Sequence, residues 1–307
     1  MKQKKKIILL AGPTASGKSK LSIMIAKFFG GEIINADSMQ IYKEINILTS
    51  KPTAKDKKLV KHHLYGFNSV EKEFSTGHWL DKATKNIKLQ WAKGKIPIVV
   101  GGTGLYFKAL IDGLVKIPEI SKSVKKDVRK LHKKIGQKRF YKKLIKIDPF
   151  AKTMILPTDS QRSIRAYEVK KFNKKSIFNF MKDTKSNFDK DVFIKIFINA
   201  PKEILHKKIN ERVESMFNQG AVKEVKKFLK MKINKDLPPN KIIGMREIRE
   251  FLEEKASLSE TKELIKLRTR QYAKRQFTWA RGHMKSWEML YSSDLNDLYR
   301  KVINKIS

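Results

Sequence analysis

The sequence predicts an α/β fold: a P-loop NTPase-like parallel sheet with helices on both faces and an inserted, basic, all-helical domain. Three observations support this prediction. Short apolar segments alternate with helical patterns early in the chain, a phosphate-binding loop follows the first of them, and a long basic stretch interrupts the strands. Strand–helix alternation is typical of a parallel sheet, because a parallel crossover needs a connecting helix.

Four short segments have the composition of buried strands. They are rich in Ile or Val, are bounded by Gly, Pro or Asp, and cover residues 6–10, 32–36, 96–100 and 192–199. Continuous apolar runs of this length are typical of strands that are covered on both faces. Helical patterns separate the early strands, for example over residues 18–29 and 78–92.

The stretch between the third and fourth strands is unusual. Residues 116–190 read as helices throughout and hold 23 Lys or Arg against 7 Asp or Glu. A basic helical block within an α/β core indicates a second module. We therefore expect a helical insertion domain over 116–190 and a core with C-terminal helices formed by 1–115 and 191–307.

Composition narrows the function classes. The formal charge of +39 favours a polyanionic partner, although lysine is spread along the chain and much of it reads as solvated background. The absence of cysteine excludes disulfides and cysteine-ligated metals. No apolar run approaches the roughly 18 residues of a membrane span, and no export signal is apparent. We therefore expect a cytoplasmic protein, without membrane contact and monomeric.

A complete phosphate-binding loop follows the first strand. The pattern G-x-x-x-x-G-K-[ST] is matched by Gly12, Pro13, Thr14, Ala15, Ser16, Gly17, Lys18 and Ser19. In such a loop, backbone N–H groups at a helix N-terminus surround anionic oxygens, the lysine reaches the outer phosphate and the serine hydroxyl can hold Mg²⁺. The loop does not distinguish ATP from another diphosphate.

Two further loops are expected at the same edge of the sheet. Asp37 closes the second strand, which we expect beside the P-loop strand, and Gly101-Gly102-Thr103 follows the third. Asp37 could be a base that deprotonates an acceptor, an outer-shell Mg²⁺ ligand, or only the residue of an Asx turn. The third strand ends without the acid of a Walker B segment, which weakens an ordinary ATPase interpretation.

With these loops in view, the chain resembles the tRNA dimethylallyltransferase (tRNA isopentenyltransferase) family from Gly12 to about Gly282. Residues 12–19 are similar to its P-loop. Further signatures lie at Asp37-Ser38-Met39-Gln40-Ile41-Tyr42-Lys43, Lys51-Pro52-Thr53, His62-His63-Leu64 and Val100-Gly101-Gly102-Thr103-Gly104-Leu105-Tyr106. Later matches are Asp148-Pro149, the D-x-Q-R-x-x-R-A-x-E-V pattern at 159–169 and the T-R-x-x-A-K-R-Q-x-T-W pattern at 269–279.

The resemblance implies transfer of a dimethylallyl group from dimethylallyl diphosphate to N6 of adenosine 37, in tRNAs that read codons starting with U, with Mg²⁺ at Ser19. It implies catalytic roles for Asp37, Thr103 and Arg212. It also implies tRNA contacts by Asp37, Ser38, Met39, Gln40, Thr103, Lys125, Gln161, Arg162, Ser163, Ile164, Arg165, Arg246, Arg270, Lys274, Arg275 and Arg281. From the residues alone, Arg212 could instead only pair with Glu211 or Glu214 on a helix.

The sequence departs from the family pattern at Lys125, Leu156, Thr158 and Met245, all in parts expected to touch tRNA. Two rival functions also fit the P-loop. One is a kinase of a small metabolite, which would need neither the basic insertion nor the late Arg/Lys helix. The other is a non-catalytic RNA-binding NTPase switch, which the acid near the P-loop and the lack of a recognisable switch segment disfavour.

Overall fold

The computed structural model describes residues 5–182 and 184–306, in two compact units. The core unit runs to Ile111 and resumes at Asn187, and the insertion unit spans Asp112–Ser186. Both boundaries lie slightly earlier in the chain than the expected 116 and 190. Each unit is described by itself.

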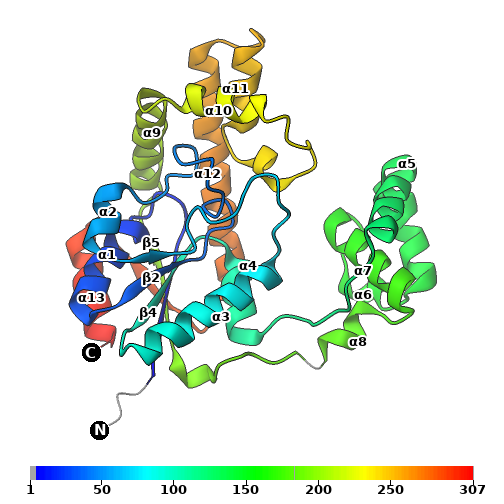
Figure 1. Ribbon diagram of the computed structural model, residues 1–307, viewed down its shortest axis with the longest axis horizontal. Helices are drawn as coiled ribbons and strands as arrows, with labels where there is room; N and C mark the ends of the chain where they lie inside the picture. Colours follow the sequence, from blue (N-terminus) through cyan, green and yellow to red (C-terminus); the bar gives the residue numbers. More distant parts are fainter. Residues whose placement is uncertain (1–4, 183, 307) are drawn as a thin grey trace. The chain divides into compact units, whose positions relative to one another are not determined.

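Within the described part of the chain, six strands form one parallel sheet in the order β3-β2-β4-β1-β5-β6 (Figure 1). The strands are β1 (Ile7–Ala11), β2 (Glu32–Asn35), β3 (His62–His63), β4 (Pro97–Gly101), β5 (Phe193–Asn199) and β6 (Glu288–Tyr291). The four predicted strands are present, and both edge strands were missed. The prediction that the Asp37 strand lies beside the P-loop strand is wrong, because β4 separates β2 from β1.

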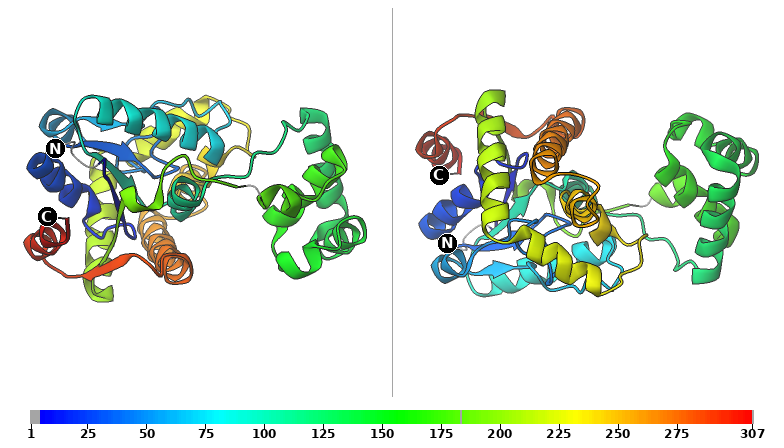
Figure 2. Two further views of the ribbon diagram at one scale, coloured as in Figure 1. Left: turned by 90° about the horizontal axis from the view of Figure 1, so that it is seen from below. Right: turned by 90° about the horizontal axis from the view of Figure 1, so that it is seen from above.

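Helices cover both faces of the sheet, as predicted. On one face, α1 (Lys18–Phe29) and α13 (Leu295–Ile306) pack against alternate strand residues such as Ile8, Leu10 and Ile196. These two helices lie side by side in both views of Figure 2. The intervening strand residues point to the opposite face, where α3 (Thr76–Ala92) contacts β2 and β4 and α4 (Gly104–Asp112) follows β4.

The C-terminal helices of the core unit bury a separate apolar cluster. They are α9 (Lys202–Asn218), α10 (Ala221–Lys230), α11 (Met245–Leu252) and α12 (Leu258–His283), and they pack around Ile41, Tyr42, Ile45 and Leu48 of the segment after β2. The Glu224 carboxylate fixes this segment by accepting bonds from the backbone N–H groups of Asn46, Ile47 and Leu48. The short α2 (Ala54–Leu59) follows it.

Met245 lies fully buried in this cluster. Its departure from the family pattern was expected in a part of the chain that touches tRNA, whereas the side chain is enclosed by apolar neighbours. Because a methionine side chain is flexible and fills irregular apolar gaps, the departure concerns packing at the start of α11.

Helices are the only regular secondary structure in the described part of the insertion unit. It consists of α5 (Lys122–Ile147), α6 (Ala151–Met154), α7 (Ser160–Asn173) and α8 (Ile177–Met181). Its small core contains Tyr141, Leu144, Ala151, Ile155 and Ala166. The helix α5 is interrupted at Gly136, whose φ of 73° suits a glycine. Across both units, the described helices include none that is long and apolar enough to cross a membrane.

Candidate active site

The phosphate-binding loop connects β1 to α1 in a backbone conformation that depends on its glycines. Gly17 precedes the first residue of α1 with φ 91°, a conformation that side chains disfavour. A Cβ on Gly12 would lie 2.6 Å from the carbonyl oxygen of Ile198 in β5, so only glycine fits there. Among the described residues, the buried Ser16 hydroxyl has no hydrogen-bond partner, which suits a loop that receives a ligand oxygen.

Two cationic side chains form hydrogen bonds to residues of this loop. The Lys18 ammonium donates to the carbonyl of Pro13 at 3.0 Å, and Arg212 of α9 donates through Nη1 to the Thr14 hydroxyl at 2.8 Å. The alternative in which Arg212 only pairs with a glutamate on its own helix is disfavoured, because Glu214 pairs with Lys262 and Lys266 of α12. A lysine and an arginine therefore stand at the loop that the sequence identified.

Asp37 follows β2 and is held by its neighbours. Its backbone N–H donates to the side-chain oxygen of the buried Asn35 at 2.8 Å, and its Oδ1 accepts from the N–H of Met39 at 2.9 Å. The Asx turn that the sequence left as an alternative is therefore present. It uses one of the two carboxylate oxygens and fixes the orientation of the group.

Thr103 joins the loop after β4 to the loop after β2. Its N–H donates to the Ala36 carbonyl at 3.1 Å, while its hydroxyl accepts from the Ser38 N–H at 3.0 Å and lies 3.3 Å from the Ser38 hydroxyl. Gly101 makes this approach possible, because a Cβ there would collide with the Ala36 backbone. The strand order thus brings Asp37, Ser38 and Thr103 together.

The charge of Asp37 affects the titration of the two cationic side chains at the phosphate-binding loop. Burial lowers the pKa of Lys18 to about 8, the Asp37 charge opposes this shift and the Arg212 charge adds to it. Burial also lowers the pKa of Arg212, again opposed by Asp37. The pKa values of Tyr65, Tyr106 and Tyr272 are raised by burial first and by the Asp37 charge second. One carboxylate therefore acts on both cations and on three tyrosines.

A pKa of about 8 for Lys18 predicts that diphosphate binding takes up a proton in mildly alkaline solution. Above pH 8 much of the free lysine is neutral, and a bound anion favours its charged form. Below about pH 7 the lysine is already protonated, so uptake at this site should vanish. Calorimetric titration with inorganic pyrophosphate in buffers of different ionisation enthalpy measures the uptake. Equal uptake by Lys18→Ala would contradict the assignment.

The other residues of the core unit that were predicted to contact tRNA lie in several places. The Gln40 amide donates to the carbonyls of Thr49 and Ser50, and Met39 packs against the cluster around Ile41. Arg246 pairs with Glu250, and Arg270 donates to Asn210. Lys274, Arg275 and Arg281 are exposed on α12, with Arg275 over the ring of Tyr272.

In the insertion unit, Arg162 is exposed and pairs with Asp159, the N-cap residue of α7. Arg165 pairs with the buried Glu168, Gln161 is exposed, and Lys125 and Ile164 are partly exposed. Ser163 differs from its prediction as a tRNA contact: it is fully buried, and its hydroxyl accepts from Gln137 at 3.1 Å. Its small side chain lets α5 and α7 pack closely.

Gln276 of α12 was not among the predicted site residues. Its side-chain oxygen accepts from the Thr14 N–H at 2.8 Å, and its side-chain nitrogen donates to the Gly102 carbonyl at 2.9 Å. The residue stands inside the T-R-x-x-A-K-R-Q-x-T-W pattern, which was the available signal. Only the Arg and Lys residues of that pattern were predicted to contact tRNA.

Comparisons with known proteins agree with this geometry. A family model described as IPP transferase matches residues 40–283, and one described as isopentenyl transferase matches residues 5–69. A tRNA dimethylallyltransferase of Pelagibacter ubique is 54% identical over 94% of this chain and 92% of its own length. The chain belongs to the tRNA dimethylallyltransferase family. The predicted family membership is confirmed.

Further members of the family are similar over nearly the whole chain. A tRNA dimethylallyltransferase of Rickettsia bellii is 43% identical over 99% of this chain and 96% of its own length. A crystallised eukaryotic dimethylallyltransferase acting on tRNA is 30% identical with a TM-score of 0.81, over 95% of this chain and 75% of that one. The tRNA isopentenylpyrophosphate transferase of Staphylococcus epidermidis is 30% identical with a TM-score of 0.70, over 99% of each chain.

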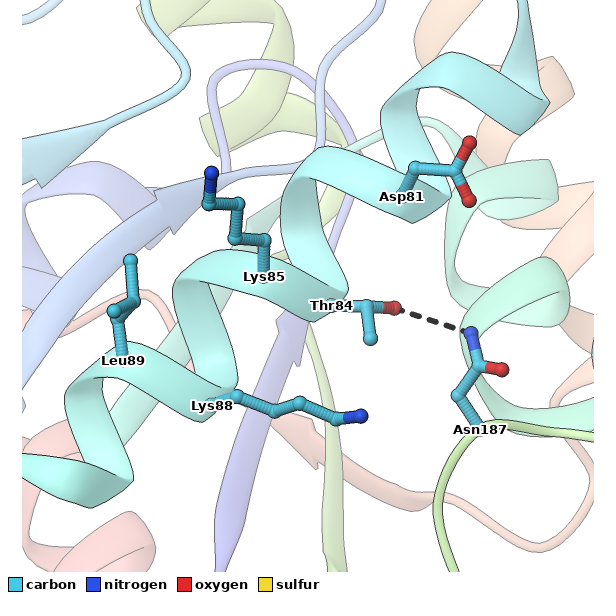
Figure 3. Close-up of a pocket in the computed structure, with 6 residues that line it drawn as sticks. All are labelled: Asp81, Thr84, Lys85, Lys88, Leu89 and Asn187. Carbon is cyan, nitrogen blue, oxygen red and sulfur yellow. Dashed lines mark hydrogen bonds between the residues drawn. The ribbon is translucent and has the colours of Figure 1, made fainter.

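A shallow pocket away from these loops lies on the exposed side of α3 and includes Asp81, Lys88 and Asn187 (Figure 3). It holds none of the predicted site residues, and its Asp81 and Lys88 side chains are exposed. Within the described residues, no group of three or more His, Asp or Glu side chains could hold a metal ion by itself.

Proposed function

We propose that this chain transfers a dimethylallyl group from dimethylallyl diphosphate to N6 of adenosine 37, in tRNAs that read codons starting with U. The observation that carries the proposal is the position of Asp37, whose loop is joined through Thr103 and Gln276 to the phosphate loop and whose charge acts on Lys18 and Arg212. A proton acceptor therefore stands near the cations of a phosphate loop. The names of the family members supply the group transferred and the class of acceptor.

In the proposed reaction, the bond between the first prenyl carbon and the diphosphate oxygen breaks while that carbon bonds to N6. Asp37 accepts the N6 proton as the new bond forms, because an adenine amino group is too weakly acidic to lose it beforehand. Lys18 and Arg212 stabilise the charge that develops on the leaving diphosphate. Thr103 keeps the Asp37–Ser38 loop in place through its bonds to Ser38.

Mg²⁺ fits the donor set of this loop. The ion commonly takes one or two protein oxygens and completes its shell with substrate phosphates and water. We propose Ser19, the second residue of α1, as its protein ligand. When bound, Mg²⁺ would neutralise charge on the diphosphate. Because Lys18, Asp37, Thr103 and Arg212 all come from one core unit, a monomer is sufficient for the proposed chemistry.

The function is tested with purified protein, dimethylallyl diphosphate labelled in the prenyl group, and tRNA. We expect label to enter tRNA without ATP and to appear on adenosine 37 after nuclease digestion. A strict requirement for ATP, with ATP consumed, would support a kinase or an NTPase switch and overturn the proposal.

We propose that the insertion unit binds tRNA by contacting the phosphates of the tRNA backbone. The unit contains most of the Lys and Arg residues that outnumber Asp and Glu over residues 116–190. Its Arg162 side chain is 69% exposed. An adenine within a stacked loop must also be flipped out to react, at a cost of a few kcal/mol. Phosphate contacts can offset that cost, because each contact releases counterions.

Charge reversal at Lys125 and Arg162 is expected to raise the KM for tRNA. It should also flatten the salt dependence of tRNA binding by about one unit of log–log slope for each lost phosphate contact. Binding of dimethylallyl diphosphate should be unaffected. The matched control is Lys88→Glu on the exposed side of α3 (Figure 3). If the variant keeps the wild-type slope across a salt series, the insertion unit does not make these contacts.

A further inference from the structure

The phosphate loop and the glycine loop after β4 both lie against the helix α12. A Cβ on Gly102 would lie 3.4 Å from the carbonyl oxygen of Gly12, so the loop after β4 touches the phosphate loop. Gln276 forms hydrogen bonds to both loops. Along the sequence it is 262 residues from Thr14 and 174 residues from Gly102. Close by, the ring of Trp279 occupies the space that a Cβ on Gly104 would need. The helix α12 is therefore packed directly onto both loops.

The contact depends on the amide chemistry of Gln276. Its carbonyl oxygen accepts from the phosphate loop, and its amino group donates to the other loop. A glutamate of the same size can accept but cannot donate, and a methionine offers only a weak sulfur acceptor. Gly102 is needed as well, because a Cβ there would collide with the side-chain nitrogen of Gln276.

We propose that Gln276 is a positioning residue for prenyl transfer. It fixes the loop that holds the donor diphosphate against the loop that carries Thr103, and Thr103 in turn holds the Asp37–Ser38 loop. Gln276 thereby sets the distance between the reactive prenyl carbon and the proton acceptor. The inference rests on the proposed function and adds a residue whose two contacts are both to backbone groups.

A positioning role should lower the rate of reaction more than it lowers substrate binding. Gln276→Met is expected to reduce kcat about 10- to 100-fold, since small misplacements of reacting groups carry costs of this size. The KM for the donor and the affinity for inorganic pyrophosphate should stay within about fivefold, the equivalent of one ordinary hydrogen bond. Gln276→Glu keeps an acceptor for the Thr14 N–H but sets a carboxylate oxygen against the Gly102 carbonyl, so it should also lower kcat. The control is Gln219→Met, an exposed glutamine whose amide donates to Ser215 at the end of α9.

A double-mutant cycle tests the contact itself. Gly102→Ala in the wild-type background should displace the Gln276 side chain and lower kcat about as much as Gln276→Ala does. In the Gln276→Ala background the space is free, so Gly102→Ala should have little further effect. Such non-additivity is the signature of two residues that act through one contact.

Thermal unfolding of each variant is recorded beside the kinetics, and Gln276→Glu remains informative if Gln276→Met unfolds. Additive effects in the cycle would overturn the inference, as would a Gln276→Met enzyme with wild-type kcat. So would a variant that loses pyrophosphate binding in proportion to its rate, because that would make Gln276 a part of the phosphate site. Failure of the wild-type protein to prenylate tRNA would instead reject the proposed function.

Discussion

Lys18→Ala is expected to lower kcat/KM for the prenyl donor by about 10²–10³. This is the usual effect of removing one preorganised donor from a site where negative charge develops. The Lys18 ammonium stands in the phosphate loop and interacts electrostatically with Asp37, and no shift of the backbone can replace its charge there. Steady-state kinetics with varied dimethylallyl diphosphate measures the loss, and inorganic pyrophosphate should compete with that donor in the wild-type enzyme.

Lys20→Ala provides the matched control, because Lys20 is an exposed lysine on the same helix. It should leave both kinetic constants near the wild-type values. The expected loss in kcat/KM for the donor is about 10²–10³. A loss of less than about twofold in Lys18→Ala would show that Lys18 and its loop do not act on the donor diphosphate.

Asp37→Asn is expected to lower kcat by about 10²–10⁴, the range for loss of a general base. Asparagine keeps the shape and keeps an oxygen for the Met39 N–H, so the turn after β2 should be preserved. Its amide cannot accept the N6 proton. The affinity for tRNA should remain within several-fold of wild type. Single-turnover prenylation at saturating tRNA and donor isolates this step.

A Mg²⁺ titration separates the two roles that the sequence left open for Asp37. If Asp37 acted only by holding the ion through water, added Mg²⁺ would restore the variant, and donor binding would fall together with the rate. A general base cannot be replaced by metal in this way. Asp81→Asn, an exposed carboxylate on α3, is the control for a simple change of surface charge (Figure 3).

Arg212 shows how the structure chose between two interpretations that the sequence permitted. On its helix it has acidic neighbours at Glu211 and Glu214, which made a local ion pair plausible. In the folded chain its guanidinium reaches Thr14, 198 residues away, and α12 supplies the partners of Glu214. Charge patterns along one helix cannot reveal such a choice, because it depends on which other helix packs alongside.

Local sequence determined the strongest features of this protein. The glycines of residues 12–19 fix the backbone of the phosphate loop, and the runs of Ile and Val fix the four central strands, because these patterns act over a few neighbouring residues. The interruption by a basic helical stretch indicated the insertion in the same way. The ordered signatures along the chain predicted the family, and the comparisons confirmed it.

Tertiary structure decided what local patterns do not encode. β3 pairs through two residues and β6 lies at an edge with alternate residues exposed, so neither shows a strong apolar run. The order that places β4 between β1 and β2 is a choice among parallel pairings. The bridge made by Gln276, the burial of Met245 and Ser163, and the reach of Arg212 all depend on how helices pack on the finished sheet. Such long-range contacts form only when the whole core is assembled, so the composition and periodicity of a few neighbouring residues do not predict them.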